Sequence, residues 1–232
     1  MQEAVQTQAL FDLSKTVAAD LLARFERPWD ALPHISEFIL SLGAGLDLAE
    51  YDQRGEDVWI SKQATVFPSA YIKGPCIIMA GSEVRHCAFI RGSALVGRDC
   101  VVGNSTELKN VILFDHVEVP HYNYVGDSIL GYKAHMGAGS ITSNIKADRR
   151  DVVITGNIGC VGETACLPTH LRKMGAMIGD YAEIGCNSVL NPGTIIGRRT
   201  SVYPLTMVRG FVPADSIYKS GGGEIVTREE KV

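Results

Sequence analysis

Residues 72–96 read IKGPCIIMAGSEVRHCAFIRGSALV, and an aliphatic side chain returns at every sixth position of this stretch. The same register extends over residues 60–108, continues through 113–136 with two shortened units, and returns over 178–208. Through most of the repeat, a small side chain stands four positions after each aliphatic one. Neither an α-helix nor an alternating strand has a period of six, so the repeat itself must define the architecture.

A unit of six residues is interpreted as one short strand followed by a corner, with the aliphatic side chain inside and the small one at the corner. Three such units form one coil of a prism, and successive coils pair as parallel strands about 4.8 Å apart. Each coil contacts only its neighbours, so both ends need caps. The sequence therefore predicts an all-β fold, a parallel β-helix over residues 56–215.

The composition fits such a core and excludes several classes of protein. Of 232 residues, 46% are apolar but only 7% aromatic, with 24 glycines and a net charge of −4. The apolar content excludes wholesale disorder, and no apolar run reaches the roughly 18 residues of a membrane helix. The chain has neither a basic block nor a secretion signal at its N-terminus. We expect a cytoplasmic protein without membrane or nucleic-acid partners, whose six cysteines stay reduced.

Three segments depart from the repeat. Residues 10–25 carry a helical stripe of apolar side chains, and Pro33 and Gly43 bracket a second helical segment, so residues 1–55 are expected to form an appendage of two helices. The polar stretch 142–177 interrupts the coils and should project from the prism, because long loops rarely fit inside a repeat. The tail, residues 216–232, is expected to fray.

Three cations share one position in their repeats. Lys73, Arg91 and Lys109 are spaced by one coil each, directly after the aliphatic residue. The prism would stack them about 4.8 Å apart in a column on one face. Like charges at that distance repel unless an anion lies among them, and a phosphate group suits this role. The alternative from the residues alone is that the three side chains splay into solvent.

The stretch PHYNYVGDSILGYKAHMGAGSITSN, residues 120–144, carries a resemblance to a known family. Hexapeptide repeats of this kind resemble the left-handed β-helix acyltransferase superfamily. The stretch itself resembles the acetyltransferase domain of the bifunctional N-acetylglucosamine-1-phosphate uridyltransferase/glucosamine-1-phosphate acetyltransferase, with its motif N-H-x-x-Y-x-G-D. Later segments are similar to the related sugar-1-phosphate nucleotidylyltransferases. The resemblance implies a left-handed prism, a homotrimer and an acyl-CoA site between adjacent prisms.

The resemblance also implies roles for single residues. His121 matches the general base, Tyr124 a tyrosine that contacts substrate, and Asn144 an asparagine of the amino-sugar site. The other matched positions are Arg91 and Lys109 for the sugar phosphate, with Lys73 a weaker member, Arg150 in place of a lysine, His135 in place of an asparagine, and Cys186 in place of a serine near the thioester. The sequence Ile145–Lys146–Ala147 departs from the tyrosine–aspartate–glycine of the family.

Coenzyme A is harder to place from the sequence. The small side chains of Cys186, Asn187 and Pro204 would let a pantetheine arm lie along the C-terminal coils. The basic candidates for its phosphates are Arg172, Lys173, Arg198, Arg199 and Arg209, which are equally compatible with an ordinary solvated surface.

The sequence thus predicts an acetyl-CoA-dependent N-acetyltransferase acting on an amino-sugar 1-phosphate, with His121 as the base and no metal. Two alternatives stay open: a binding protein for sugar phosphates or sugar nucleotides that has lost the chemistry, and an acyltransferase with another acceptor. Zinc catalysis by His86, His116 and His121 is disfavoured, because two of them lie two coils apart. Nucleotide transfer is also disfavoured, because the chain has no G-x-G-T-R loop.

Overall fold

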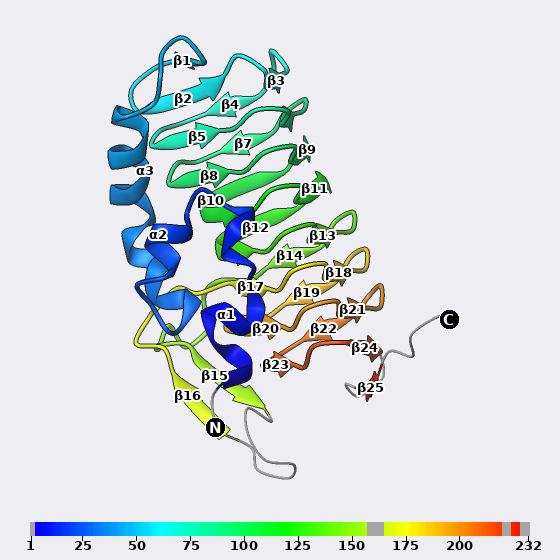
Figure 1. The fold of residues 1–232 in the computed structure, drawn as a ribbon. Coiled ribbons are helices and arrows are strands. Elements are labelled where there is room, and N and C mark those ends of the chain that lie inside the picture. The colour runs from blue at the N-terminus through cyan, green and yellow to red at the C-terminus, as the bar shows by residue number, and fades with distance from the viewer. Residues whose placement is uncertain (1–2, 157–164, 220–223, 228–232) are drawn as a thin grey trace.

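The computed structural model describes residues 3–156, 165–219 and 224–227, and short strands make up most of it (Figure 1). The chain winds through these strands as a parallel β-helix with three faces. Strands β10 (Glu107–Leu113) and β12 (Tyr124–Leu130) each turn a corner and contribute to two faces. The predicted β-helix is confirmed.

We number the faces in the order in which the chain meets them. The first face consists of β2 (Val58–Ser61), β5 (Cys76–Ile78), β8 (Ala94–Val96), the ends of β10 and β12, β17 (Ala176–Ile178), β20 (Thr194–Ile196) and β23 (Phe211–Val212). The second face consists of β3 (Thr65–Val66), β6 (Glu83–Val84), β9 (Val101–Asn104), β11 (Glu118–His121), β13 (His135–Met136), β18 (Glu183–Ile184), β21 (Ser201–Val202) and β24 (Ser216–Lys219). The third face consists of β4 (Tyr71–Ile72), β7 (Phe89–Ile90), the starts of β10 and β12, β14 (Ile141–Thr142), β19 (Val189–Leu190) and β22 (Met207–Val208).

The strand register reproduces the repeat of the sequence. Cys76 lies beside Ala94, the equivalent residue of the next coil, and Ala94 in turn lies beside Val111. Fewer residues separate Ala94 from Val111 than separate Cys76 from Ala94, because one hexad of the second coil lacks a residue. Ile129 lies beside Met177, so the interruption lengthens a single coil without shifting the strands on either side of it.

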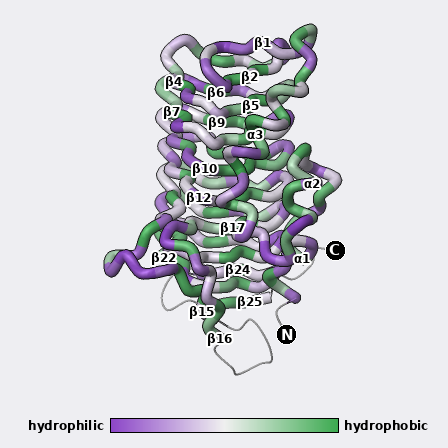
Figure 2. Tube along the Cα trace, turned by 90° about the vertical axis from the view of Figure 1, so that its left-hand side faces the viewer, coloured by the Kyte–Doolittle hydropathy of each residue, from purple (hydrophilic) through white to green (hydrophobic). Residues whose placement is uncertain are grey.

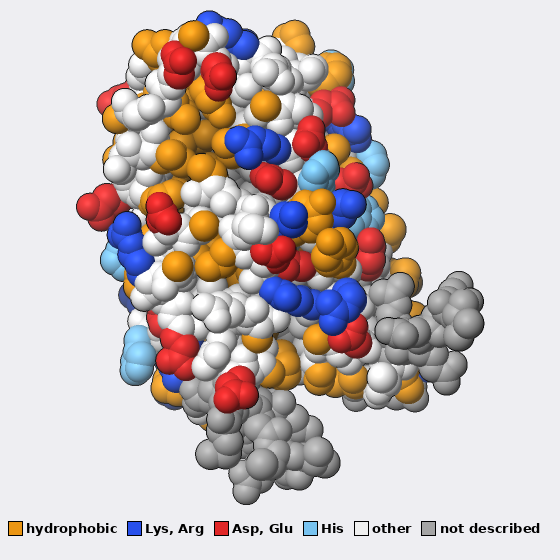
Figure 3. All heavy atoms as spheres, in the orientation of Figure 1, with side chains coloured by type: hydrophobic (Ala, Val, Ile, Leu, Met, Phe, Trp, Pro, Cys, Tyr) orange, Lys and Arg blue, Asp and Glu red, His pale blue; other side chains and the backbone are white. Residues whose placement is uncertain are grey.

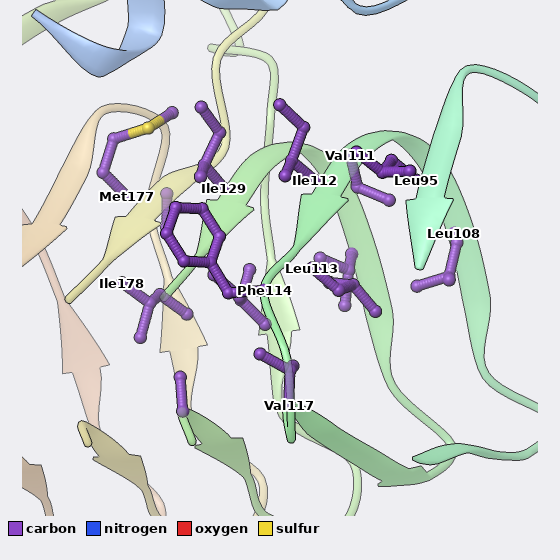
Figure 4. Packing of buried hydrophobic residues seen from close by; sticks show 14 of the residues in the cluster. Leu95, Leu108, Val111, Ile112, Leu113, Phe114, Val117, Ile129, Met177 and Ile178 are labelled. Carbon is purple, nitrogen blue, oxygen red and sulfur yellow. The ribbon is translucent and has the colours of Figure 1, made fainter. Parts of the chain in front are cut away.

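The first face is buried on both sides. Between its inward residues stands a second column of large apolar side chains that point outward, and all of them are buried: Trp59, Ile77, Leu95, Ile112, Ile129, Met177, Ile195 and Phe211. Figure 4 shows Met177, Ile129 and Ile112 in a row on one side of the strands, with Ile178 and Leu113 on the other. This face therefore requires a cover.

The N-terminal segment supplies that cover. Helix α3 (Ile35–Ala44) contacts β5, β8 and β10, and the 3₁₀ helix η3 (Pro28–His34) contacts β12 (Figures 1 and 2). Gly43 of α3 lies so close to the Trp59 ring that a Cβ atom there would be 2.4 Å from it. The second predicted helix is confirmed, and it packs onto the prism.

The first predicted helix is wrong. Residues 3–22 instead form short pieces, namely η1 (Glu3–Val5), α1 (Thr7–Leu10), η2 (Leu13–Lys15) and α2 (Ala19–Leu22). The Asp12 carboxylate accepts from the Ser14 backbone N–H, and the Thr16 hydroxyl accepts from that of Ala18. Side chains that bond the nearby backbone in this way compete with helix hydrogen bonds and divide the segment.

The interruption of the coils contains an antiparallel hairpin of β15 (Val153–Gly156) and β16 (Ala165–Pro168). Its strands extend beyond the coils in Figure 1, yet β15 also contacts β23. Val152 and Ile154 beside it are fully buried. The insertion thus projects as predicted but packs part of its length against the C-terminal coils. Cys160 lies outside the described residues.

Each end of the β-helix carries a strand that runs in the opposite direction. At the start, β1 (Tyr51–Gln53) pairs antiparallel with β2, and at the end β25 (Glu224–Thr227) pairs antiparallel with β24. Residues 216–219 and 224–227 of the predicted tail are therefore strands and do not fray. Across the described ranges, no helix is long and apolar enough to span a membrane.

Candidate functional site

The cation column lies on the third face, where the sequence predicts it. In the strand register, Tyr71 lies beside Phe89, and Phe89 lies beside Glu107. The cation of each coil stands two residues after these, so Lys73, Arg91 and Lys109 lie on successive coils. Lys73 is exposed. Arg91 Nη1 donates to Glu107 Oε1 at 2.7 Å, and Lys109 Nζ to Asp127 Oδ1 at 2.7 Å. Two of the three cations therefore already have a carboxylate partner in the chain.

Asp127 is the centre of a polar cluster that the sequence analysis did not assign. Its side chain is almost fully buried and accepts hydrogen bonds from Lys109, from Asn110 at 3.0 Å, and from Asn144. Asn144 Nδ2 also contacts the Tyr124 hydroxyl at 3.1 Å. The cluster therefore links two predicted substrate residues, Tyr124 and Asn144, to the predicted phosphate residue Lys109.

Gly126 makes room for this arrangement. It lies beside Lys109 in the register, so a glycine takes the place of the next member of the cation column. A Cβ atom there would lie 2.5 Å from the Tyr124 hydroxyl and 2.9 Å from Asn144 Nδ2. The order Tyr-x-Gly-Asp thus has a steric explanation, since any side chain at 126 would displace the tyrosine from the asparagine.

Burial and nearby carboxylates influence the titration of this cluster. Burial raises the pKa of the Tyr124 phenol above its usual value, and the negative charges of Asp127 and Glu107 raise it further. The phenol therefore remains protonated at neutral pH. The hydrogen bond to Glu107 raises the pKa of the Arg91 guanidinium, which keeps its charge throughout.

His121 occupies the corner between the second and third faces. It ends β11 and is exposed, and within the part of the chain that the structure describes its imidazole has no hydrogen-bond partner. The following coils place Ala138, Cys186 and Pro204 in the same corner column. Backbone hydrogen bonds connect the successive coils at this corner, from Gly139 to His121 at 2.9 Å, from Asn187 to Ala138 at 2.8 Å and from Leu205 to Cys186 at 2.9 Å. A column of small side chains therefore leads away from an exposed histidine.

Other predicted site residues lie elsewhere. His135 is on the second face, where its Nδ1 contacts Glu183 Oε2 at 3.0 Å, and this hydrogen bond raises the pKa of His135 above its usual value. Arg150 is exposed within the insertion. Arg209 lines a cavity of about 550 Å³ between the third face and the insertion, together with Lys146. The structure thus brings together Arg91, Lys109, Tyr124 and Asn144, but not His135 or Arg150.

Two of the cations proposed for coenzyme A phosphates are paired. Arg198 Nε lies 3.4 Å from Asp180 Oδ2, and Arg199 donates to both carboxylate oxygens of Asp215. On the face of the molecule seen in Figure 3, basic and acidic side chains are intermixed. Arg198 is thus paired with a buried carboxylate and Arg199 with an exposed one, so neither is a free cation for a coenzyme A phosphate.

The three histidines considered for zinc are separated. His86 lies in the His121 corner column with Asn104 between them, and its Nδ1 contacts the Ser69 hydroxyl at 3.0 Å. His116 lies 3.7 Å from Asp99 at the corner between the first and second faces. Among the described residues, no three histidine, cysteine or acidic side chains are grouped to hold a metal.

A sequence signal for Asp127 was present. The residue directly after each member of the cation column is Gly74, Gly92, Asn110 and then Asp127, one coil apart. Gly92, Asn110 and Asp127 have φ values of 100°, 55° and 48°. Glycine, asparagine and aspartate adopt positive φ more readily than other residues, so their recurrence at this position fits a tight corner. At such a corner a polar side chain can turn back toward the cation.

Comparisons with known proteins agree with this architecture. A family model described as the GMPPB C-terminal domain matches residues 72–172. The bifunctional protein GlmU of Methanococcus maripaludis is 34% identical over 196 residues, which cover 83% of this chain and 46% of GlmU. A bifunctional sugar-1-phosphate nucleotidylyltransferase/acetyltransferase of Sulfurisphaera tokodaii is 29% identical over 162 residues, 70% of this chain and 39% of that protein.

Among solved structures, a hexapeptide transferase family protein from Anaplasma phagocytophilum gives a TM-score of 0.42 at 13% identity, covering 75% of this chain and 80% of that one. The chain spans less than half the length of the curated relatives described above. Coils and sequence matches together define a hexapeptide-repeat β-helix protein. More closely, it is a β-helix of the GlmU acetyltransferase-domain type.

Proposed function

We propose that this protein is an acetyl-CoA-dependent N-acetyltransferase that acts on an amino-sugar 1-phosphate, with His121 as general base. The observation that carries the proposal is the position of His121. Its imidazole has no hydrogen-bond partner among the described residues. It lies at an exposed corner, three residues before Tyr124 of the polar cluster and at the head of the small-residue column. Acceptor and thioester would therefore meet at the imidazole.

In the proposed reaction the amine nitrogen attacks the thioester carbonyl carbon. A C–N bond forms and the C–S bond breaks. His121 takes the proton that the amine loses, and the departing sulfur ends as the protonated thiol of coenzyme A. Histidine suits this role because its ordinary pKa lies near neutral pH. Tyr124 and Asn144 would orient the sugar, while Lys73, Arg91 and Lys109 would attract its phosphate.

Coenzyme A would lie along the corner column. Ala138, Cys186 and Pro204 leave space there for a slender arm, and Arg209 and Lys146 beside the insertion would meet its phosphates. The name of the relative from Sulfurisphaera, a bifunctional sugar-1-phosphate nucleotidylyltransferase/acetyltransferase, supports acetyl transfer in a protein that acts on sugar phosphates. A homotrimer is part of the proposal. The exposed apolar side chains of Tyr122, Leu205 and Met207, which follow the same corner, support it.

The test is release of coenzyme A thiol from acetyl-CoA in the presence of glucosamine 1-phosphate. We expect turnover by the wild type and a loss on the order of 10²–10⁴-fold in His121→Ala. His86→Ala is the matched control, because His86 lies in the same corner column two coils earlier and should be dispensable. A wild type that releases no thiol with any amino-sugar phosphate rules out the proposal.

A binding protein without catalysis is the second candidate. The pairing of Arg91 with Glu107 and of Lys109 with Asp127 favours it, because these carboxylates compete with an incoming phosphate. It predicts binding of the sugar phosphate, measured by calorimetry, without thiol release. An acyltransferase with another acceptor is distinguished by the same thiol assay across a panel of amines.

A further inference from the structure

A cavity of about 580 Å³ lies at the corner between the third and first faces. Three parts of the chain enclose it: Leu32 belongs to the N-terminal segment, Asn110 and Asp127 to the β-helix, and Arg149, Arg172 and Lys173 to the insertion. Its volume is in the usual range for small-molecule sites. His121 lies at a different corner of the prism and does not line this cavity.

The charge in this cavity is unbalanced. Arg149, Arg172 and Lys173 all line it, and none of the three forms an ion pair with another described residue. The lining acid, Asp127, already accepts from Lys109, Asn110 and Asn144. Three cations around one shared cavity repel one another in a chain whose net charge is −4. An anion bound among them would relieve that repulsion.

Hydrogen bonds fix the position of this basic wall. Met174, which directly follows Lys173, donates its backbone N–H to the Asn144 carbonyl at 3.0 Å, and Gly175 donates to the Asp127 carbonyl at 2.8 Å. Before the two cations, Leu171 accepts from the Val152 backbone N–H at 2.8 Å. The pair Arg172–Lys173 is thus held between two anchored positions. Because the backbone of this loop is already anchored, little conformational entropy is lost when its charges bind a ligand.

The opposite wall is also anchored. Asn110 Nδ2 donates to the Leu32 carbonyl at 3.3 Å while it contacts Asp127, which ties the N-terminal segment to the floor of the cavity. Leu32 and the lining residues Pro33, Ile145 and Leu171 add apolar surface. The cavity therefore combines a cationic wall with apolar walls, which suits a ligand that has a charged end and a flat or apolar body.

We propose that this cavity binds an organic diphosphate, such as a nucleoside diphosphate, at a site separate from the acceptor site beside His121. Two arginines offer paired N–H groups that match phosphate oxygens, and a diphosphate carries enough charge to balance three cations. The shared residue Asp127 connects the two sites, because it contacts the cavity and also holds Lys109. The site does not depend on acyl transfer taking place.

The test is isothermal titration calorimetry of the full chain with inorganic pyrophosphate, with orthophosphate and with a nucleoside diphosphate. We expect the nucleoside diphosphate to bind most tightly, orthophosphate most weakly, and added salt to weaken all three. In the double variant Arg172→Ala/Lys173→Ala the affinity for pyrophosphate should fall by about tenfold or more. Arg54→Ala removes an exposed cation near the opposite end of the β-helix and should leave binding unchanged.

Two outcomes overturn the proposal. One is a wild type that does not bind pyrophosphate at low salt, and the other is a double variant that binds it as tightly as the wild type does. A circular dichroism melt of each variant separates loss of the site from loss of the fold. A titration at saturating glucosamine 1-phosphate tests whether the sites are separate. An unchanged affinity for pyrophosphate supports two separate sites. If glucosamine 1-phosphate competes with pyrophosphate, the cavity receives the phosphate of the acceptor, and the proposal of a separate site is overturned.

Discussion

Lys109 and Asp127 lie on successive coils and form an ion pair of 2.7 Å, in which the lysine side chain is 29% exposed and the aspartate 5%. Because the acid is the buried partner, it determines where the ammonium group rests. The same carboxylate holds Asn110 and Asn144, so one buried side chain positions groups from the coil before its own and the coil after it. Asp127 therefore connects the stability of the corner to the geometry of the candidate site.

Replacement of this carboxylate should destabilise the protein. Asp127→Ala removes the acceptor that Lys109, Asn110 and Asn144 share, which costs about 1–3 kcal/mol in the free energy of unfolding. Asp127→Asn should cost less, because asparagine tolerates the φ of 48° at this position. Urea denaturation measures both. The exposed acid Asp20, replaced by alanine, is the control and should cause little change. Equal stability of Asp127→Ala and wild type contradicts this role.

A side chain at Gly126 should weaken acceptor binding more than it weakens the fold. In Gly126→Ala the new Cβ displaces the Tyr124 hydroxyl from Asn144, and we expect the KM for the amino-sugar phosphate to rise on the order of tenfold. Gly45→Ala is the control, since the nearest atom to a Cβ there is 3.6 Å away. In a Tyr124→Phe background the effect of Gly126→Ala should shrink. The same rise in both backgrounds would show that the hydroxyl is not the displaced group.

Asp180 should be needed to hold the N-terminal segment. This buried carboxylate accepts the backbone N–H groups of Asp12 at 2.7 Å and Tyr132 at 2.8 Å. Asp180→Ala leaves both donors unpaired and should cost about 3 kcal/mol in stability. Limited proteolysis should then cut residues 3–30 faster. Glu37→Ala, which removes an exposed acid from α3, should leave the cleavage rate as it is. Unchanged cleavage in Asp180→Ala would argue against this anchor.

The pair of His135 and Glu183 should make stability depend on pH. The hydrogen bond to Glu183 raises the pKa of His135, and the negative charge of Glu118 adds a smaller contribution. The pair lies in a surface pocket that is also lined by His116, Glu118 and Lys133. A raised histidine pKa stabilises the fold below the unfolded pKa of about 6.5, and this stabilisation is lost as pH rises through the folded value. The free energy of unfolding of the wild type should therefore exceed that of Glu183→Gln by under about 1 kcal/mol near pH 6. Near pH 9 the two proteins should be equally stable.

Nuclear magnetic resonance titration of the imidazole signals checks the cause of this pH dependence. The pKa of His135 should fall in Glu183→Gln and should fall less in Glu118→Gln. A histidine that titrates identically in wild type and Glu183→Gln would remove the basis of the stability prediction.

The coils were predictable because single positions of the repeat determine their geometry. One residue in each hexad points inward, so the period of the prism is also the period of the sequence, and the shortened unit before Leu113 appears as a shorter step between β8 and β10. The polar cluster was predictable in part. Lys109 follows from the spacing of the cations, and Tyr124 and Asn144 follow from the resemblance. The role of Asp127 depends on the conformation of its corner, which the sequence pattern alone does not reveal.

The N-terminal segment could not be predicted in the same way. Its stripe of apolar residues fits one helix, but local side-chain bonds of Asp12 and Thr16 divide it. The Asp12 backbone N–H is also held by Asp180, which is far away in the sequence. A period of six also does not reveal the outward apolar column on the first face, because each coil contributes only one residue to this column. Both features arise from contacts between the appendage and the prism, which local patterns do not contain.

The two reversed strands cover open edges at the two ends of the β-helix. An exposed end of a β-helix offers a row of free backbone groups, which can act as a template for the first coil of another copy and so start a fibre. Here β1 occupies the edge of the first face at one end, and β25 occupies the edge of the second face at the other. A copy arriving end to end would need parallel partners and would meet antiparallel strands instead. The reversed strands thereby remove the parallel template at these two edges.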